Sequence, residues 1–498
     1  PPRSTPLYSS AASDVYKRQP RSLPFREEID EHKGHPGIRA TTLSYGQIND
    51  DMLEMLEKPH PSYFLLVLGF LSALLLGAVS LAIQVDVGIG NSGISHPIAW
   101  GFYITDFVFW IGIGHAGTLI SAVFYLTRAP WRTAIYRSAE AMTVFAVLTA
   151  GLFPLLHTGR PWLAYWLIPY PNERYLWVNF KSPLAWDVFA VTTYMSVSIM
   201  FFLLGLVPDM AILRDEAKRR GKILQAKIYA IFAMSWRGTN HQWVHFMRGY
   251  LIFAALATPL VFSVHSIVSW DFAMASIPGW HTTIFAPYFV AGAIFSGLAM
   301  VMTVLIPVRV VFRLEDYISN HVINKVCQVI LFTSLIVGYA YATEFFIAWY
   351  SGSPYERAVF YFRPFGHMAT WSLTGDQPVS FPLLAFYLMV FCNVIAPIPL
   401  WRKKVRNNLV AVWIICGLIN VGMWFERFNI VGSSLQRDFH PYNWGEYWPT
   451  LVEVGITIGS FGFFFTLFAL FVKALPPMAI MELKEAAEPP MRKGHHEH

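Results

Sequence analysis

The chain has 498 residues and a formal net charge of +6, and 55% of its residues are hydrophobic but only 14% are charged. A soluble domain carries about 25% charged residues, so this chain has too few charges to cover the surface of a soluble globule. Disordered chains are poor in apolar residues, and nucleic-acid-binding proteins need dense basic charge. The composition therefore predicts a polytopic protein of the lipid bilayer, with no nucleic-acid partner.

The beginning of the chain differs from the rest. Residues 1–22 are polar and patternless and start with Pro1, so we expect this stretch to be non-native or disordered. Residues 23–62 are expected to form a segment on the cytoplasmic side. A helix that crosses a bilayer needs about 20 apolar residues. The stretches that reach this length are 63–85, 97–126, 138–157, 183–207, 245–268, 282–312, 323–349, 380–400, 408–426 and 449–474.

A weak internal repeat divides these predicted spans. The second and sixth carry Gly112 and Gly297 in the same register and run in the same direction, which indicates two bundles related by a parallel repeat. Asp106 and His115 of the first copy correspond to apolar residues in the second. The chemistry is therefore expected in the first bundle.

The predicted fold class is an all-α integral membrane protein, with about ten transmembrane helices arranged as two four-helix bundles plus two peripheral helices. Its predicted parts are a first transmembrane helix and loop (63–96), the first bundle (97–268), the second bundle (269–431), a last loop and transmembrane helix (432–474), and a cytoplasmic tail (475–498).

Positive charge in the connecting loops sets the predicted orientation. Clusters of Lys and Arg follow the second, fourth and eighth predicted helices, whereas the loops on the other side hold few. The positive-inside rule therefore places both termini in the cytoplasm. The opposite loops are rich in Trp, Tyr, Phe and Pro, which fits either an interfacial aromatic belt or a docking surface for an extracytoplasmic partner.

Cysteine usage limits the cofactors. Cys327, Cys392 and Cys416 lie inside apolar runs, and none belongs to a CxxC motif. A disulfide framework is not expected. Structural zinc sites and iron–sulfur clusters usually take several cysteine ligands, so neither is expected in this chain. Any metal that accepts electrons is expected on another subunit.

Two ionisable residues lie inside the second predicted helix. On insertion scales such a residue costs roughly 2.5–3.5 kcal/mol at a helix centre, so it needs a partner or a function. Asp106 and His115 are nine residues apart, and about 100° per residue puts them on opposite faces of a straight helix. His115 is either hydrogen-bonded to a neighbouring helix or part of a proton relay.

The motif HTGRPW places His157, Arg160 and Trp162 at the outer end of the third predicted helix. Asp187 lies one turn inside the fourth, whose start is marked by a Ser-Pro pair as N-cap and first residue. His157 and Asp187 are therefore expected at similar depth. A His–carboxylate pair at an apolar interface suits reversible proton exchange near neutral pH. The alternative is a salt bridge that closes a helix end.

Three further ionisable residues have open roles. Glu140, at the cytoplasmic start of the third predicted helix, is either a carboxylate favoured by the helix dipole or part of a proton path. His265 and Glu344 lie toward the outer ends of the fifth and seventh predicted helices and are expected to line the same cavity. A membrane haem needs paired axial histidines at matching depth. His115 and His265 differ in predicted depth, so no haem is expected.

Longer stretches carry a family resemblance. The motifs HTGRPW, SPLAWD and IGIGHAGTLISA, with the stretches GLFPLLHTGRPWLAYW (151–166) and IPGWHTTIFAPYFVAGAIFSG (277–297), resemble the NrfD-like family, the membrane subunits of polysulfide reductase-type enzymes. Within that family the chain resembles a large NrfD-like membrane subunit of alternative complex III. The likeness extends over residues 63–474.

The resemblance implies a subunit of the bacterial inner membrane that oxidises a quinol, either menaquinol or ubiquinol, on the extracytoplasmic side and is not active alone. The partners it implies are an extracytoplasmic iron–sulfur subunit, haem c subunits and a homologous second membrane subunit, with neither haem nor iron–sulfur cluster in this chain. Electrons would leave quinol for the iron–sulfur subunit.

The resemblance also implies roles for individual residues. His157 and Asp187 would be the catalytic pair that flanks the quinol head group. The other assignments are quinone binding for Arg160, Trp162 and His265, and a proton path for Asp106, His115 and Glu140. Two other functions remain open. A secondary transporter built from repeats would need midplane charges in both halves, and a catalytically silent anchor would bind no quinone.

Overall fold

The computed structural model describes residues 45–57, 61–168, 180–366 and 380–486. The stretch 1–22, most of 23–62, the last residues of the tail and parts of two aromatic loops therefore lie outside the described residues. Within the described ranges the chain forms α-helices with short 3-10 and π-helical turns, and those ranges contain no β-strand. The all-α fold class is confirmed for this part of the chain.

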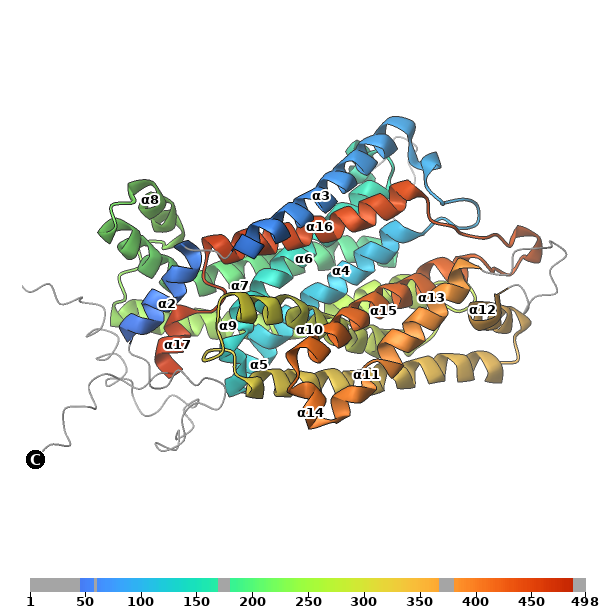
Figure 1. Ribbon diagram of the computed structural model, residues 1–498. Helices are drawn as coiled ribbons and strands as arrows, with labels where there is room; N and C mark the ends of the chain where they lie inside the picture. The colour runs from blue at the N-terminus through green and yellow to red at the C-terminus, as the bar shows by residue number, and fades with distance from the viewer. Residues whose placement is uncertain (1–44, 58–60, 169–179, 367–379, 487–498) are drawn as a thin grey trace, which may run out of the picture.

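Ten helices are long and apolar enough to cross a membrane, and they confirm the ten predicted spans. Figure 1 shows them running side by side along the molecule. They are α3 (Pro61–Val87), α4 (Phe102–Thr118) with its continuation to Leu126, α6 (Tyr136–His157), α7 (Pro183–Arg219), α9 (Asn240–Ala273), α10 (Phe285–Val311), α11 (Asn320–Tyr350), α13 (Phe381–Val390) with its continuation to Trp401, α15 (Leu409–Leu435) and α16 (Leu451–Ala474).

Some helices extend well beyond their predicted apolar runs. α7 begins at the predicted N-cap Ser182 and first residue Pro183, but it continues to Arg219. Its added turns are rich in Ala, Leu, Arg, Glu and Lys, which favour helix without needing lipid. α15 likewise continues to Leu435. An apolar run marks only the part of a helix that suits lipid, so it understates helices that continue into water.

α4 and α10 form the centre of the molecule. In their most apolar windows 89% and 83% of residues are buried, compared with 11% in α3. α4 packs along α6 and α10, α7 along α9, and α13 along α15. The division into two four-helix bundles remains a prediction, because α4 also packs along α10 of the second predicted bundle.

α3 and α16 pair with each other at the edge of the molecule. Gly77 approaches Gly459 so closely that a Cβ added to Gly77 would lie 2.5 Å from the Gly459 Cα. Gly455 meets Ser80 along the same seam, and Gly462 meets the Leu74 backbone. Small residues of this kind let membrane helices pack backbone to backbone.

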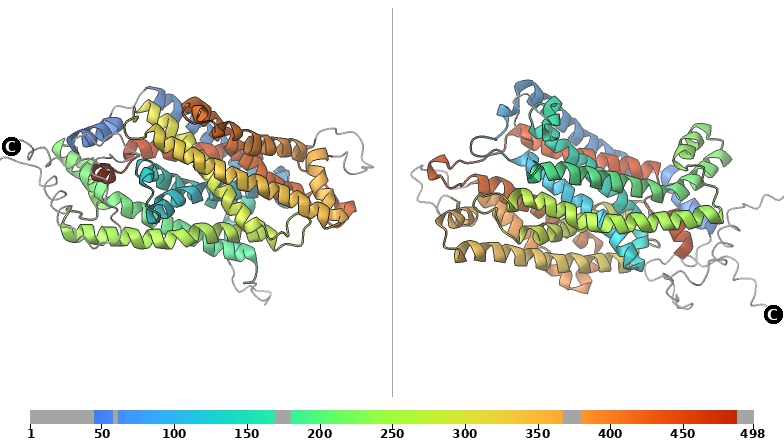
Figure 2. Two further views of the ribbon diagram at one scale, coloured as in Figure 1. Left: turned by 90° about the horizontal axis from the view of Figure 1, so that it is seen from below. Right: turned by 180° about the vertical axis from the view of Figure 1, so that it is seen from behind.

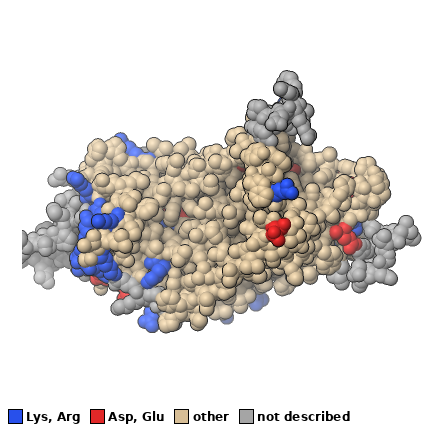
Figure 3. All heavy atoms as spheres, turned by 90° about the horizontal axis from the view of Figure 1, so that it is seen from above, with Lys and Arg blue, Asp and Glu red and all other residues tan. Residues whose placement is uncertain are grey.

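The two ends of the molecule differ in charge. One end carries α8 (Ile223–Phe232), and α2 (Tyr45–Glu57) packs there against α17 (Ile480–Ala486) (Figure 2). We call it the basic end, because Lys and Arg side chains gather there (Figure 3). The exposed members are Lys218, Arg219, Arg220, Lys222 and Lys227. The opposite end carries η5 (Pro161–Leu167) and α12 (Pro354–Phe365).

Candidate functional site

Two carboxyl groups meet between α7 and α9 at the opposite end. Asp187 lies in the second turn of α7 and Asp271 in the last turn of α9, and the two carboxyl groups are within hydrogen-bonding reach of each other. The Oδ1 atom of each is buried without another partner. A hydrogen bond between two carboxyl groups requires a donor, so the pair shares a proton.

Each aspartate follows a tryptophan, and the tryptophans also meet. The rings of Trp186 and Trp270 are T-shaped, with centroids 6.1 Å apart and 81° between their planes. Trp186 Nε1 donates a 2.6 Å hydrogen bond to the backbone oxygen of Phe180, which ties the start of α7 to the preceding segment. Two Trp-Asp dipeptides therefore face each other across the helix pair.

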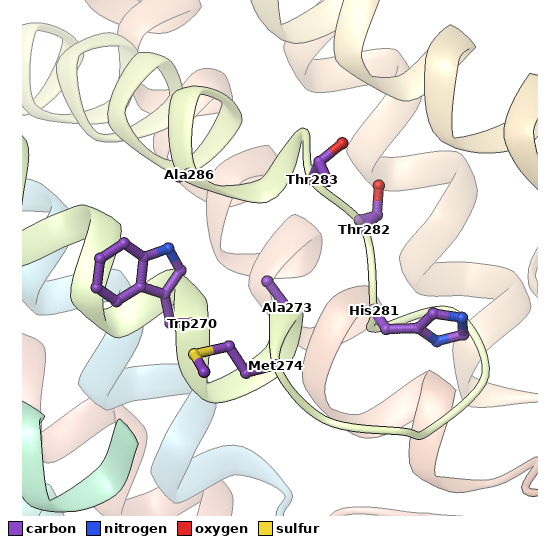
Figure 4. Close-up of a pocket in the computed structure, with 7 residues that line it drawn as sticks. All are labelled: Trp270, Ala273, Met274, His281, Thr282, Thr283 and Ala286. Carbon is purple, nitrogen blue, oxygen red and sulfur yellow. The ribbon is translucent and has the colours of Figure 1, made fainter. Parts of the chain in front are cut away.

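A cleft of about 330 Å³ opens beside Trp270. Figure 4 shows Trp270 and Met274 on α9, and His281, Thr282 and Thr283 on the loop that leads to α10. The wall thus joins apolar surface to hydroxyl and imidazole groups. This mixture is typical of small-molecule sites, whose volumes run from about 300 to 1,000 Å³.

Glu356 of α12 holds the polar wall of this cleft. Its Oε2 accepts a 2.7 Å hydrogen bond from the backbone N–H of Gly279, and its Oε1 lies 3.5 Å from His281 Nδ1. Gly279 has a φ of +83°, a conformation that other residues rarely adopt. A charged side chain and a glycine turn together fix the loop.

The structure does not join His157 to Asp187. His157 ends α6 half-buried, and among the described residues no hydrogen bond or ion pair links the two side chains. The Nδ1 atom of His157 is buried without a partner. On η5 and its flank, Arg160 is exposed and Trp162 is 63% exposed, and neither lines the cleft. Their roles in quinone binding stay predictions.

His115 lies at the centre of the molecule and is fully buried. Its Nδ1 lies 2.5 Å from the backbone oxygen of Ile111, and its ring stacks on Tyr194 with centroids 4.7 Å apart. The Tyr194 hydroxyl lies 2.7 Å from Thr118 Oγ1 and donates to the backbone oxygen of Gly114 at 2.9 Å. These contacts fix the ring and leave His115 Nε2 without a partner.

His265 overturns one prediction. Its ring centroid lies 4.8 Å from that of His115, so the prediction that these histidines differ in depth is wrong. α9 has 34 residues and is about 51 Å long at 1.5 Å per residue. The sequence alone therefore leaves open which part of α9 shares the depth of His115. Rings this close leave no room for a porphyrin between them, so the pair does not fit a bis-histidine haem.

Asp106 lies on the other face of α4, as predicted. Its Oδ1 accepts a 2.6 Å hydrogen bond from Trp424 Nε1 on α15, and its Oδ2 accepts one of 2.7 Å from Thr457 Oγ1 on α16. His115 instead contacts Tyr194 of α7 and His265 of α9. The prediction of opposite faces is confirmed.

Glu140 belongs to a buried ionic cluster toward the basic end. Arg137 lies 3.4 Å from Glu140 and 3.1 Å from Asp209 of α7. The hydroxyl of Tyr250 on α9 donates a 3.1 Å hydrogen bond to Glu140 Oε1. Glu140 is the fifth residue of α6 and is held by side chains, not by the free N–H groups of the first turn.

α17 covers this cluster. The backbone N–H of Met481 donates a 3.3 Å hydrogen bond to Asp209, and Glu482 lies 3.3 Å from Arg132. Burial lowers the pKa of Lys484 to about 8, although the nearby Asp209 carboxylate opposes this shift. The C-terminal part of the chain is therefore bound to the cluster by both its backbone and its side chains.

Sequence reasoning missed Asp271. A signal was present, because the dipeptide Trp-Asp occurs in SPLAWD and again in SIVSWD. Each copy sits at the end of a long apolar run, where a carboxylate needs a partner. Among the described residues no three His, Cys, Asp or Glu side chains gather as metal ligands do.

Residues 90–437 match the family described as polysulphide reductase, NrfD. The chain belongs to the NrfD family. It is similar to a putative dimethyl sulfoxide reductase membrane subunit of Halobacterium salinarum, with 23% identity over 79% of this chain and 86% of that protein. It is also similar to a subunit of the selenate reductase of Mesobacillus selenatarsenatis, with 19% identity over 82% of this chain and 93% of that protein. The NrfD match includes both Trp-Asp dipeptides and both buried histidines.

Proposed function

We propose that this NrfD-family subunit oxidises quinol in the cleft beside Trp270, as part of a complex of the alternative complex III type. The observation that carries the proposal is the carboxyl pair of Asp187 and Asp271, which lies next to the cleft wall and shares a proton. Electrons would pass to an iron–sulfur subunit, with haem c subunits and a homologous second membrane subunit as further partners.

The chemistry of quinol fits such a pair. Oxidation to quinone releases two electrons and two protons, so the site needs proton acceptors near the hydroxyl groups. The Asp187–Asp271 pair already holds one proton and accepts one more. The unpartnered Nδ1 of His157 is a second acceptor at the same end of α6 and α7. Trp270 and Met274 supply an apolar surface for the quinol ring.

The charge distribution supports an orientation. We place the basic end in the cytoplasm of a bacterium, together with both termini, because Lys and Arg are favoured on that side of the inner membrane. The cleft then opens at the extracytoplasmic surface. Trp162, Tyr165 and Trp166 of η5 are each more than half exposed at that end, and they offer a docking surface for the iron–sulfur subunit.

A photoreactive azidoquinone tests the site in the purified complex. We expect light-dependent labelling of the α9–α10 junction, at Trp270, Met274 or the loop 281–283, and we expect quinol to compete with it. Thr282→Val, which removes a hydroxyl from the cleft wall, should weaken labelling, whereas Thr343→Val on an exposed face of α11 should not. Labelling confined to other helices, or none at all, would support the silent anchor or the transporter instead.

A second candidate is a subunit that exchanges electrons between quinol and a terminal reductase. The names of the two relatives, a dimethyl sulfoxide reductase and a selenate reductase, favour it. Mass spectrometry of the copurifying subunits, with the absorption band of haem c, separates the two kinds of complex. The quinol site proposed above is common to both.

A further inference from the structure

A series of buried polar groups leads from His115 into α15 and α11, and the quinol site does not use it. The atoms that lack a hydrogen-bond partner of normal geometry are His115 Nε2, both ring nitrogens of His265, both terminal nitrogens of Arg427, and Glu344 Oε1. Buried polar atoms in proteins are paired with other groups or with ordered water. The series therefore indicates internal water.

His265 connects the two halves of the chain. Its ring lies 4.8 Å from His115 and 5.7 Å from Phe289 of α10, and the Arg427 guanidinium lies 4.3 Å from the centroid of the same Phe289 ring. Gly292 keeps this crossing open, because a Cβ there would lie 2.8 Å from Arg427 Nη2. The crossing is narrow, and polar groups lie on both sides of it.

The groups continue beyond Arg427 toward the opposite end. Arg427 lies 3.1 Å from Glu426, which accepts a hydrogen bond from the Tyr341 hydroxyl. Glu344, on the next turn of α11, interacts electrostatically with Arg363, Glu426 and Arg427. It precedes the end of α11 by six residues, or about 9 Å. The series therefore approaches the outer end of the second predicted bundle.

Glu453 shows how a purely structural carboxylate is held in this chain. It is buried, and its oxygens accept hydrogen bonds of 2.7 to 2.9 Å from the Tyr447 hydroxyl and from the backbone N–H groups of Gly93 and Thr450. Glu344 is equally buried, but its Oε1 has no such partner. An unpartnered carboxylate beside two arginines suits reversible protonation, whereas a fully bonded one does not.

We propose that water-linked groups carry protons from the His115–His265 pair to Glu344, which releases them at the opposite end. Each transfer moves one proton from a ring nitrogen of His265 through water to the Glu344 carboxylate, and no other bond changes. Arg427 keeps its proton and orients the water. The route rests on the proposed quinol oxidation for its driving force, and it leaves the first predicted bundle at His265.

The test uses the complete complex in sealed vesicles, supplied with quinol and its electron acceptor. In the wild type we expect more than one proton to appear on the quinol-oxidising side for each electron. In Glu344→Gln we expect only the one proton per electron that quinol itself releases, with uncoupled quinol oxidation within about twofold of wild type. The matched variant Glu453→Gln should keep the wild-type ratio.

Two results would overturn this route: a wild-type ratio of one, or an unchanged ratio in Glu344→Gln. A map of the wild-type complex at a resolution that shows water gives a separate test if the variant fails to assemble or the complex oxidises no quinol. We expect water within hydrogen-bonding distance of the His265 ring and of Arg427. A dry contact there would also exclude the route, whatever the fate of the quinol site.

Discussion

Trp186 lies edge-on to Trp270 across the α7–α9 interface, while the next residues of the two helices, Asp187 and Asp271, share a proton. Ring packing and proton sharing therefore depend on the same helix contact. A change to either aspartate alters one functional unit, and this has consequences for double variants.

We expect Asp271→Asn to lower the rate of quinol oxidation by about 10²-fold or more, as loss of a general base does. Asp187→Asn should have a similar effect. The double variant should be no slower than the slower single variant, because residues that act as a unit are not additive. Turnover of the purified complex measures this, with Asp215→Asn at the basic end as control. Multiplied losses in the double variant would show that the two carboxyl groups act independently.

Trp270 should act mainly on quinol binding. Trp270→Ala removes the aromatic wall of the cleft, and a loss of about 1.4 kcal/mol in contact energy corresponds to a tenfold higher KM. The kcat should change far less, because the carboxyl pair remains. Steady-state kinetics with a soluble quinol separates the two constants, and Trp401→Ala, an exposed tryptophan far from the cleft, is the control. A fall in kcat with unchanged KM would argue against a quinol at this wall.

The seam between α3 and α16 should not tolerate a side chain. Gly459→Val places methyl groups where the Gly77 backbone lies 2.4 Å from the new Cβ, and overpacking of this kind costs roughly 1–3 kcal/mol or more. We expect α3 to separate from α16, which a cross-link between cysteines placed on the two helices would report. Gly69→Val on α3 meets nothing within 4 Å and should leave the cross-link intact.

Lys484 should make the binding of α17 depend on pH. Its pKa of about 8 in the folded chain lies below the ordinary 10.5. Between these values the unfolded chain holds the proton and the folded chain does not, so the free energy of unfolding rises with pH there. Below about pH 8 the full cost of burying the charge remains.

Lys484→Met should therefore be more stable than wild type at about pH 7.5, and this advantage should shrink toward pH 10. Thermal unfolding of both proteins in the same detergent, read as the difference between their midpoints, measures the effect. An advantage that stays constant or grows with pH would contradict the buried cation.

Local patterns predicted much of this structure. The ten spans follow from apolar length, and the opposite faces of Asp106 and His115 follow from helix geometry, because both depend on one segment at a time. The meeting of His115 with His265 and of Asp187 with Asp271 depends on how one helix is shifted and rotated against another. Neither quantity is encoded within a single segment, and the length of α9 made its register ambiguous. The roles assigned to His157, Arg160 and Trp162 remain predictions.

The pairing of α3 with α16 has a consequence for how the chain is made. Tyr63 donates a 3.0 Å hydrogen bond to the backbone oxygen of Ala469, 406 residues later. At about 5–20 residues per second, ribosomes need roughly 20–80 s to synthesise the intervening chain. The earliest of the ten spans must therefore wait in the bilayer, with its glycine face uncovered, until the last one arrives. Insertion factors that shield α3 during this interval would decide how much of the protein is assembled correctly.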